Sequence, residues 1–294
     1  MRWNKITLVG VGLLGGSIGL AAKRRKLARE VAGFVRRAAS LKDCEKAGAV
    51  DYATRDLLAA VSGADIVILC TPLAQMRLLV KQMLPALKRG AIVTDVGSVK
   101  SSVVRELEPL IAKAGAHFIG SHPMAGAEKT GVLSARSDLF ECATCVVTPT
   151  GKSHKTSLTK VTQFWKSMGA RVVRLTPETH DVLVSRSSHL PHVVAAALAS
   201  MVLDPKQPQQ QVSLCANGFR DTTRIASGSP EMWRDITLAN RRNLLKSIAV
   251  FIGKLQQFQK ALKKADARAV AGLLQTAKQR RDGWCVCCAS PSPK

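Results

Sequence analysis

The stretch Ile6-Thr7-Leu8-Val9-Gly10-Val11-Gly12-Leu13-Leu14-Gly15 decides the fold. Its first four residues predict a strand, and a complete GxGxxG motif follows directly, before a helix that we expect to reach about Lys26. In that context the glycines allow a tight turn, a close approach of the backbone to a pyrophosphate, and close packing of helix on strand. The N-terminus of the helix then faces the phosphates. We therefore predict a dinucleotide site with contacts from Gly10, Gly12, Leu13, Leu14 and Gly15.

The end of the second predicted strand favours NADP over NAD. That strand covers Val31-Ala32-Gly33-Phe34-Val35, and it ends about twenty residues beyond the glycine motif, where a ribose-binding Asp or Glu is expected. Val35 stands there instead, followed by Arg36 and Arg37. A carboxylate that would repel a 2′-phosphate is missing, and two guanidinium groups can clamp such a phosphate. The alternative is that both arginines are simply solvated at the start of a helix, so NAD stays open.

The rest of the first half repeats the alternation of strand and helix. Apolar runs over 66–69 and 91–95 are separated by amphipathic helices, which is typical of a doubly wound, mostly parallel sheet of the Rossmann type. Ligands of such sheets bind beyond the carboxyl ends of the strands. Thr71 and Pro72 follow one of these strands and Ser98 follows the next, so we assign all three to the cofactor site. For Ser98 the alternative is a hydroxyl at a helix start without any chemistry.

The composition indicates a folded protein with a large positive charge. The chain has 294 residues, of which 46% are apolar and 22% charged, and this is enough for two domains. A net charge of +24 attracts polyanions, but the basic residues are scattered and aromatic residues make up only 4%, so we expect no nucleic-acid partner. Glycines interrupt the apolar run near the N-terminus, which argues against an export or membrane helix. We expect a cytoplasmic protein with no membrane partner.

The cysteines and histidines do not predict a metal centre. Of eight cysteines, Cys142 and Cys145 have CxxC spacing in a strand-like run, where an offset of three places the thiols on opposite faces. Three others lie in the tail. His189 and His192 are one helical turn apart, but no carboxylate or thiol stands in register with them. Because zinc sites usually show two ligand pairs at defined spacing, we expect no metal.

His122 is the candidate base. It stands among small residues and a proline in Gly120-Ser121-His122-Pro123-Met124-Ala125-Gly126, directly after the apolar pair Phe118-Ile119, as expected at the end of a strand that opens on a cleft. With an ordinary pKa near ~6.5, an imidazole accepts and releases a proton close to neutral pH. A lone histidine in a polar loop needs no chemistry, so this interpretation depends on the motifs that accompany it.

Four motifs in order resemble the prephenate and arogenate dehydrogenase family of tyrosine biosynthesis. They are Asp95-Val96-Gly97-Ser98-Val99-Lys100, Ser121-His122-Pro123-Met124-Ala125-Gly126-Ala127-Glu128-Lys129-Thr130-Gly131, Ser188-His189-Leu190-Pro191-His192 and Gly218-Phe219-Arg220-Asp221-Thr222-Thr223-Arg224-Ile225-Ala226. The resemblance extends from the glycine loop to Trp233-Arg234-Asp235, and only the tail after Gly283 departs from it. It implies oxidative decarboxylation of prephenate to 4-hydroxyphenylpyruvate, with hydride transfer to NADP or NAD.

The resemblance also implies roles in the chemical step. His122 would accept the proton of the ring hydroxyl, and Ser98 would hydrogen-bond that hydroxyl and help to orient the histidine. Arg224 would clamp the ring carboxylate with its planar guanidinium group, for which lysine is less suited. The structural alternative for Arg224 is the cap of a helix.

Three further residues are assigned to the substrate by the same resemblance. His192 would hydrogen-bond the substrate side chain, with His189 on the same helix. Glu128 would act at the mouth of the cleft, where it orders the loop or pairs with a cation. The alternatives are a polar stripe on a core helix for the histidines and an exposed loop charge for Glu128.

The second half of the chain is expected to be helical. We expect a dinucleotide-binding domain over 1–176, a helical substrate and dimerisation domain over 177–283, and a tail over 284–294. A long helical stretch after Pro230 carries apolar residues three or four positions apart, at Leu245, Ile248, Ile252, Leu255, Phe258 and Leu262. Such a stripe predicts a homodimer through the helical domain. The alternative is packing within one chain against a helix over 267–281.

Other functions stay open at this point. Arogenate differs from prephenate only by an amine in place of the side-chain keto oxygen, and His192 favours prephenate. A β-hydroxyacid dehydrogenase shares the glycine loop but relies on a catalytic lysine in the helical domain, and no glycine-rich lysine helix is visible. From another class, a non-catalytic basic protein that binds dinucleotide or nucleic acid would be unaffected by His122→Ala.

Overall fold

The computed structural model describes residues 2–126 and 130–289. A sheet of eight strands forms its centre, in the order β3-β2-β1-β4-β5-β6-β7-β8. The strands are β1 (Trp3–Val9), β2 (Ala28–Phe34), β3 (Tyr52–Thr54), β4 (Ile66–Leu69), β5 (Ile92–Asp95), β6 (His117–Pro123), β7 (Thr144–Thr148) and β8 (Arg171–Arg174). β1 to β6 are parallel, whereas β7 is antiparallel to β6 and parallel to β8. This order confirms the predicted Rossmann-type, mostly parallel sheet.

Helices connect these strands and form the rest of the chain. Those of the first half are α1 (Leu13–Arg24), α2 (Ala39–Ala47), α3 (Leu57–Val61), α4 (Leu73–Met83), η1 (Leu84–Ala86), α5 (Ser101–Lys113), η2 (Val132–Ser134) and α6 (Lys155–Ser167). Those of the second half are α7 (Pro177–Val184), η3 (Ser185–His189), α8 (Leu190–Val202), α9 (Gln209–Ser213), α10 (Asn217–Thr223), η4 (Arg224–Ser227), α11 (Pro230–Ala239), α12 (Arg241–Lys263) and α13 (Ala267–Ala289). The helical second half follows the expectation from the sequence.

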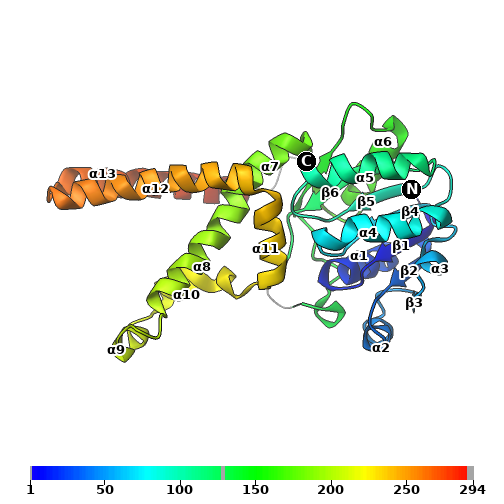
Figure 1. Cartoon of the computed structure of the whole chain (residues 1–294), viewed down its shortest axis with the longest axis horizontal. Helices are drawn as coiled ribbons and strands as arrows, with labels where there is room; N and C mark the ends of the chain where they lie inside the picture. Colours follow the sequence, from blue (N-terminus) through cyan, green and yellow to red (C-terminus); the bar gives the residue numbers. More distant parts are fainter. Residues whose placement is uncertain (1, 127–129, 290–294) are drawn as a thin grey trace. The chain divides into compact units, whose positions relative to one another are not determined.

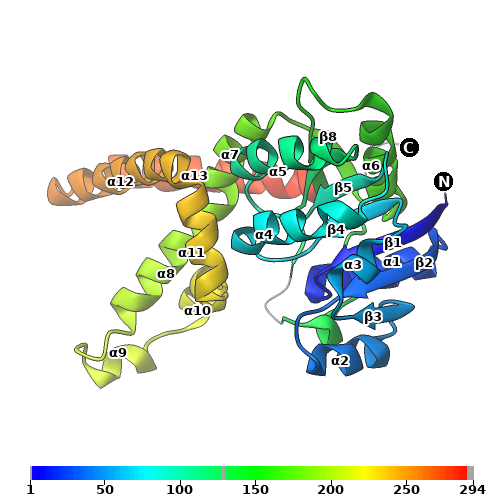
Figure 2. The same cartoon turned by 45° about the vertical axis from the view of Figure 1, so that its right-hand side comes forward.

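Alternation along the strands divides the core into two layers. On β4, Ile66 and Ile68 point to the layer that contains α1 and α6, whereas Val67 and Leu69 point to the layer that contains α3, α4 and α5. All four of these side chains are fully buried. Because both faces are covered (Figures 1 and 2), the central strand β4 is apolar throughout, and a ligand is expected to bind where the strands end.

The helical half differs from the expectation at two breaks. From Pro177 the sequence predicts one helix to about Leu203 with a local kink at Pro191, whereas the structure interrupts this helix with the π-helical turn η3, just before α8. The predicted long helix after Pro230 ends at Asn240, where α11 gives way to α12. The side chain of Asn240 is buried and donates to the carbonyl of Asp181 at 2.7 Å, which fixes the break at this residue.

The chain divides into two compact units, over 1–243 and 244–294. The first contains the sheet and the helices through α11, and within it α7 contacts α5 and α11 contacts α4. The second contains most of α12 and all of the described part of α13. The boundary expected at residue 176 lies inside the first unit, between β8 and α7. Across the described ranges we find no helix with the length and apolar character needed to span a membrane.

Candidate active site

The glycine loop joins β1 to α1 with the geometry that a dinucleotide requires. Gly10 has a φ of +99°, a left-handed conformation that favours glycine. A Cβ on Gly15 would lie 2.1 Å from the carbonyl oxygen of Gly10, so only glycine lets α1 start this close to the strand. Gly12 is the N-cap of α1 and supplies no side-chain cap, which leaves the first backbone N–H groups of the helix for an anion.

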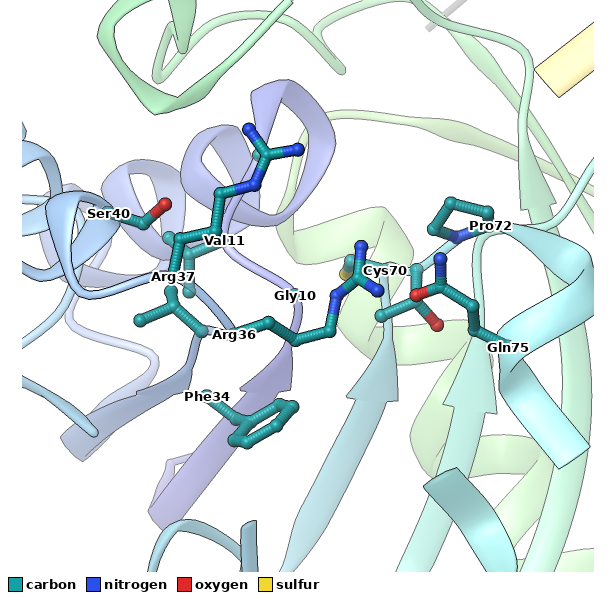
Figure 3. Close-up of a pocket in the computed structure, with 12 residues that line it drawn as sticks. Gly10, Val11, Phe34, Arg36, Arg37, Ser40, Cys70, Pro72 and Gln75 are labelled. Atoms are coloured by element: carbon teal, nitrogen blue, oxygen red, sulfur yellow. The ribbon is translucent and has the colours of Figure 1, made fainter. Parts of the chain in front are cut away.

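A pocket extends from this loop to the ends of β2 and β4. It is lined by the loop itself, by the arginines after β2, and by the segment after β4, namely Gly10, Val11, Gly12, Phe34, Val35, Arg36, Arg37, Ser40, Cys70, Thr71, Pro72 and Gln75. Figure 3 shows the guanidinium group of Arg36 directed toward Cys70 and Gln75, and that of Arg37 directed away from them. Residues predicted for the cofactor from three separate segments therefore meet in one pocket, although Leu13, Leu14, Gly15 and Ser98 are not among those that line it.

The polar atoms of this pocket fit a nicotinamide dinucleotide. The hydroxyl oxygen of Thr71 and the amide oxygen of Gln75 are buried and have no hydrogen-bond partner within the described part of the chain. Orphaned atoms of this kind suit the hydroxyl groups of a ribose, because a buried polar atom without a partner is costly. Gln75 was not predicted from the sequence; its position in the first turn of α4, three residues after Pro72, is the signal that was available.

His122 lies near the carboxyl end of β6 and is the first member of a buried chain of hydrogen bonds. Its Nδ1 is 2.8 Å from Nε2 of His180, and Nδ1 of His180 is 2.8 Å from Oδ1 of Asp181. The carboxylate of Asp181 also accepts the backbone N–H groups of Lys100 at 2.7 Å and Ser101 at 2.9 Å, at the start of α5. Both histidines and the aspartate are buried. α7 thus brings His180 and Asp181 to the predicted base.

Burial sets the protonation of these groups. It lowers the pKa of His122 well below its ordinary value, and the neighbouring His180 and Lys100 act in the same direction. The pKa of His180 is also lowered by burial, against the opposing effect of its bond to Asp181. Burial alone would raise the pKa of Asp181, but the hydrogen bonds from His180, Lys100 and Ser101 outweigh it and lower that pKa. At neutral pH both histidines are therefore neutral and Asp181 is ionised.

His189 occupies the interior beside the Ser98 loop. It lies in η3 and is fully buried, and its Nδ1 is 3.2 Å from the side-chain amide of Asn240. Burial lowers the pKa of His189 to about 4. Its Nε2 has no hydrogen-bond partner among the residues that the structure describes. Ser98 is half-buried in the loop between β5 and α5.

His192 and Arg224 belong to the helical side of the site. The ring of His192 stacks on Trp233 of α11 with 3.4 Å between the centroids, and its Nδ1 is 3.0 Å from the carbonyl oxygen of Ser188. Arg224 is exposed at the start of η4, which packs against α8, the helix that carries His192. Glu128 lies outside the described residues. Trp233 was part of the motif pattern in the sequence, but its stacking on His192 was not predicted.

The histidines and cysteines whose side chains the structure describes do not assemble a metal site. Within residues 2–126 and 130–284, no cluster of three His, Cys, Asp or Glu side chains has the geometry to hold a metal ion. The predicted strand through the CxxC pair begins only at Thr144; Cys142 precedes it, exposed and with a φ of 61°, whereas Cys145 is buried in β7.

A glycine loop after the first strand of a Rossmann-type sheet, with a neutral, buried histidine near the carboxyl end of another strand of the same sheet, defines the class of dinucleotide-dependent oxidoreductases. Comparison with known proteins gives the family. Residues 18–174 match the nucleotide-binding domain of prephenate dehydrogenase and residues 176–276 match its dimerisation domain. The chain therefore belongs to the prephenate dehydrogenase family, as the motifs indicated.

Individual relatives agree with this assignment over most of their length. The prephenate dehydrogenase of Bacillus subtilis is 34% identical over 282 residues, which are 95% of this chain and 76% of that protein. The crystal structure of Aquifex aeolicus prephenate dehydrogenase with hydroxyphenyl propionate and NAD+ superposes with a TM-score of 0.90 at 32% identity, covering 96% of this chain and 99% of that one. Synechocystis arogenate dehydrogenase gives a TM-score of 0.80 at 32% identity, with 95% and 99% covered.

Proposed function

We propose that this chain is an NAD(P)-dependent dehydrogenase that converts prephenate to 4-hydroxyphenylpyruvate in tyrosine biosynthesis. The observation that carries the proposal is the buried chain His122–His180–Asp181, which starts near the carboxyl end of β6 in the same sheet whose strands β1, β2 and β4 end at the dinucleotide pocket. A bound nicotinamide would supply the acceptor for the hydride that leaves the hydroxyl-bearing carbon of the substrate. Loss of the ring carboxylate as carbon dioxide makes the ring aromatic, so the protein mainly positions the substrate and takes one proton.

The hydrogen-bond chain determines which nitrogen of His122 is the base. The ionised Asp181 only accepts, so Nδ1 of His180 carries the proton and its Nε2 accepts. Nδ1 of His122 must then donate to His180, which leaves a lone pair on Nε2 of His122. In the proposed step this nitrogen takes the hydroxyl proton of the substrate. The new positive charge is stabilised through His180 by the carboxylate of Asp181.

The remaining residues bind ligands in this proposal. Gly10, Gly12, Leu13, Leu14 and Gly15 hold the dinucleotide phosphates at the start of α1, with Thr71 and Pro72 beside the ribose. Ser98 orients the substrate hydroxyl, and Arg224 pairs with the ring carboxylate. His189, His192 and Glu128 bind or enclose the substrate side chain. We retain 1–176 as the dinucleotide domain, 177–283 as the substrate and dimerisation domain, and 284–294 as a tail.

We infer a preference for NADP from the pocket at the end of β2. Val35 is buried where a ribose-binding carboxylate would stand, and Arg36, Arg37 and Ser40 line the same pocket. Two cations and a hydroxyl favour the additional phosphate of NADP. The double variant Arg36→Ala/Arg37→Ala should raise the KM for NADP by about tenfold or more and change the KM for NAD much less, since each charged hydrogen bond is worth about 1.5–3 kcal/mol. Equal effects on both cofactors would contradict the preference.

A specific observation keeps arogenate as the second candidate. Because the carbonyl of Ser188 only accepts, Nδ1 of His192 carries a proton, and burial lowers the pKa of this histidine. A neutral His192 therefore offers an acceptor at Nε2, which suits the ammonium group of arogenate, whereas a keto oxygen needs the protonated ring. The predicted preference for prephenate thus depends on the protonation of His192 in the complex.

One assay tests the proposed function. Purified protein is supplied with prephenate or arogenate, each with NAD or NADP, and the reduced nicotinamide is followed by absorbance. We expect turnover with prephenate, and His122→Asn should lower kcat by about 10²–10⁴-fold, the usual contribution of a general base. Dinucleotide binding by His122→Asn, measured by fluorescence titration, should remain. Wild-type turnover in His122→Asn would overturn the mechanism, and failure of the wild type with both substrates would overturn the function.

A further inference from the structure

A buried lysine, Lys100, lies beneath the proposed active site and has no role in the mechanism above. Its side chain is fully buried, at the N-terminus of α5. The ammonium group donates to Oδ2 of Asp95 and, at 2.9 Å, to the carbonyl oxygen of Ser121. A fully buried ammonium group is costly unless it is paired and hydrogen-bonded, so these contacts fix Lys100 in place.

Both partners of the ammonium group lead to residues of the proposed chemistry. Asp95 accepts the backbone N–H of Gly97 at 2.9 Å, which shapes the loop that carries Ser98. Ser121 directly precedes His122 on β6, and its own N–H donates to the second oxygen of Asp95 at 3.1 Å. The lysine therefore ties the end of β5 to the end of β6.

The backbone of Lys100 makes a third connection. Its N–H donates to Asp181 at 2.7 Å, the carboxylate that orients His180 and, through it, His122. Lys100 is thus linked to the loop that carries Ser98, to the strand that carries His122, and to Asp181 at the end of the His122–His180–Asp181 chain. We propose that Lys100 is a positioning residue of the active site, which fixes the strand of His122 and the loop of Ser98, and that its buried positive charge adds to the effect of burial in opposing protonation of the base. This inference rests on the proposed function.

The groups around His122 give the sign of the electrostatic effect. Three groups face His122, namely the neutral His180 of α7, His189 of η3 and the thiol of Cys145 of β7. The pKa of this thiol is raised well above its ordinary value. Each is uncharged at neutral pH. The ionised carboxylate of Asp181 is separated from His122 by His180.

The remaining charged pair beside His122 is Lys100 with Asp95. Burial lowers the pKa of His122 most, and the neighbouring His180 and the charge of Lys100 lower it further. Asp95 acts instead on His180 and raises its pKa. Removing the ammonium group therefore takes away the cation that opposes protonation of the base.

The test is the pH dependence of kcat/KM. The rate requires neutral His122, so activity falls as the pH drops through its pKa, and a lowered pKa extends activity to more acidic solution. In Lys100→Met we expect this acidic limb to move up by about one pH unit, with a lower kcat. Lys100→Arg keeps the charge and should keep the limb while kcat falls. Lys23→Met removes a lysine of a surface ion pair with Asp51 and should change neither.

A second variant separates the cation from the unpaired carboxylate that Lys100→Met leaves behind. Lys100→Met/Asp95→Asn has no isolated buried charge, so it should fold where the single variant fails. Its acidic limb should also lie above that of the wild type, and a limb at the wild-type position would overturn the inference. The wild type is measured alongside the variants. If the wild type itself shows no turnover, that result counts against the proposed function and not against the role of Lys100. In that case NMR titration of the His122 imidazole, assigned with His122→Asn, gives the same comparison without turnover.

Discussion

At the scale of single residues, Asp181 decides which nitrogen of His122 is free to act. In Asp181→Asn the amide oxygen can replace only one of the two carboxylate oxygens, which now accept from His180, Lys100 and Ser101. An amide N–H turned to His180 would reverse both tautomers and place a proton on Nε2 of His122. We expect kcat to fall by about 10²-fold or more, as when the orienting carboxylate of other histidine bases is replaced.

The dinucleotide affinity of Asp181→Asn should match that of the wild type, because its pocket lies at the ends of β1, β2 and β4. The measurements are steady-state kinetics and a fluorescence titration with the reduced cofactor. Asp138→Asn, in an exposed ion pair with Arg136, is the matched control and should keep full activity. A kcat within twofold of the wild type in Asp181→Asn would contradict the orienting role.

The sequence was sufficient to place the candidate base at the end of a strand but not to find the groups that hydrogen-bond to it. His122 stands in a motif whose residues are contiguous, so its position at a strand end could be inferred. His180 lies 58 positions away on a different helix, and only the packing of α7 against α5 brings it to the strand. The same holds for Lys100, whose ammonium group donates to the carbonyl oxygen of Ser121, 21 positions away on another strand. Contacts between elements distant in sequence leave no local pattern from which to predict them.

At the scale of elements, the roles of Gly15 and Gly12 in the loop can be distinguished by the atoms that surround each of them. A Cβ on Gly15 would lie 2.1 Å from the carbonyl oxygen of Gly10, so Gly15→Ala must move α1 away from β1. We expect the free energy of unfolding to fall by about 1–3 kcal/mol, the usual cost of overpacking, together with a loss of dinucleotide binding. A Cβ on Gly12, by contrast, would meet no atom within 4 Å among the described residues.

Gly12→Ala is therefore the control for packing. It should unfold at the same denaturant concentration as the wild type, yet bind the dinucleotide at least tenfold more weakly, because the methyl group stands where the pyrophosphate approaches the backbone. Urea unfolding and a binding titration on both variants give the comparison. Equal stability of Gly15→Ala and the wild type would show that the stability does not depend on the close approach of Gly15 to the carbonyl oxygen of Gly10.

Elements with strong patterns were predictable and those set by tertiary contacts were not. β4 is a continuous apolar run, β1 and β5 contain shorter ones, and the alternation with helices predicted their parallel pairing. β3 and α3 span only three and five residues, too short to carry a periodic pattern. The break at Asn240 is set by a side-chain bond to Asp181 across 59 positions, which competes with continuation of the helix. Propensity alone would favour one long helix there.

At the scale of the whole molecule, the stripe on α12 bears on the proposed homodimer. With α13 present in the same unit, Leu245 is still 65% exposed, Leu255 53% and Leu262 65%. Large apolar side chains repeated along one helix at this exposure are typical of a surface that a partner covers. The match of residues 176–276 to a family dimerisation domain supports the same proposal. The alternative of packing only within the chain leaves these side chains in water.

Charge placed in the stripe should therefore separate the subunits. We expect the wild type to sediment with about twice the chain mass of 31.5 kDa. Ile252→Glu/Leu255→Glu should sediment at or near the mass of one chain at micromolar concentration, because each carboxylate would lose its hydration in the interface. Gln257→Glu adds a negative charge to an exposed position on the opposite side of α12 from the stripe and should remain at the wild-type mass. Circular dichroism on the same samples establishes that the helices persist. A double variant that keeps the wild-type mass would exclude this face of α12 as the subunit contact.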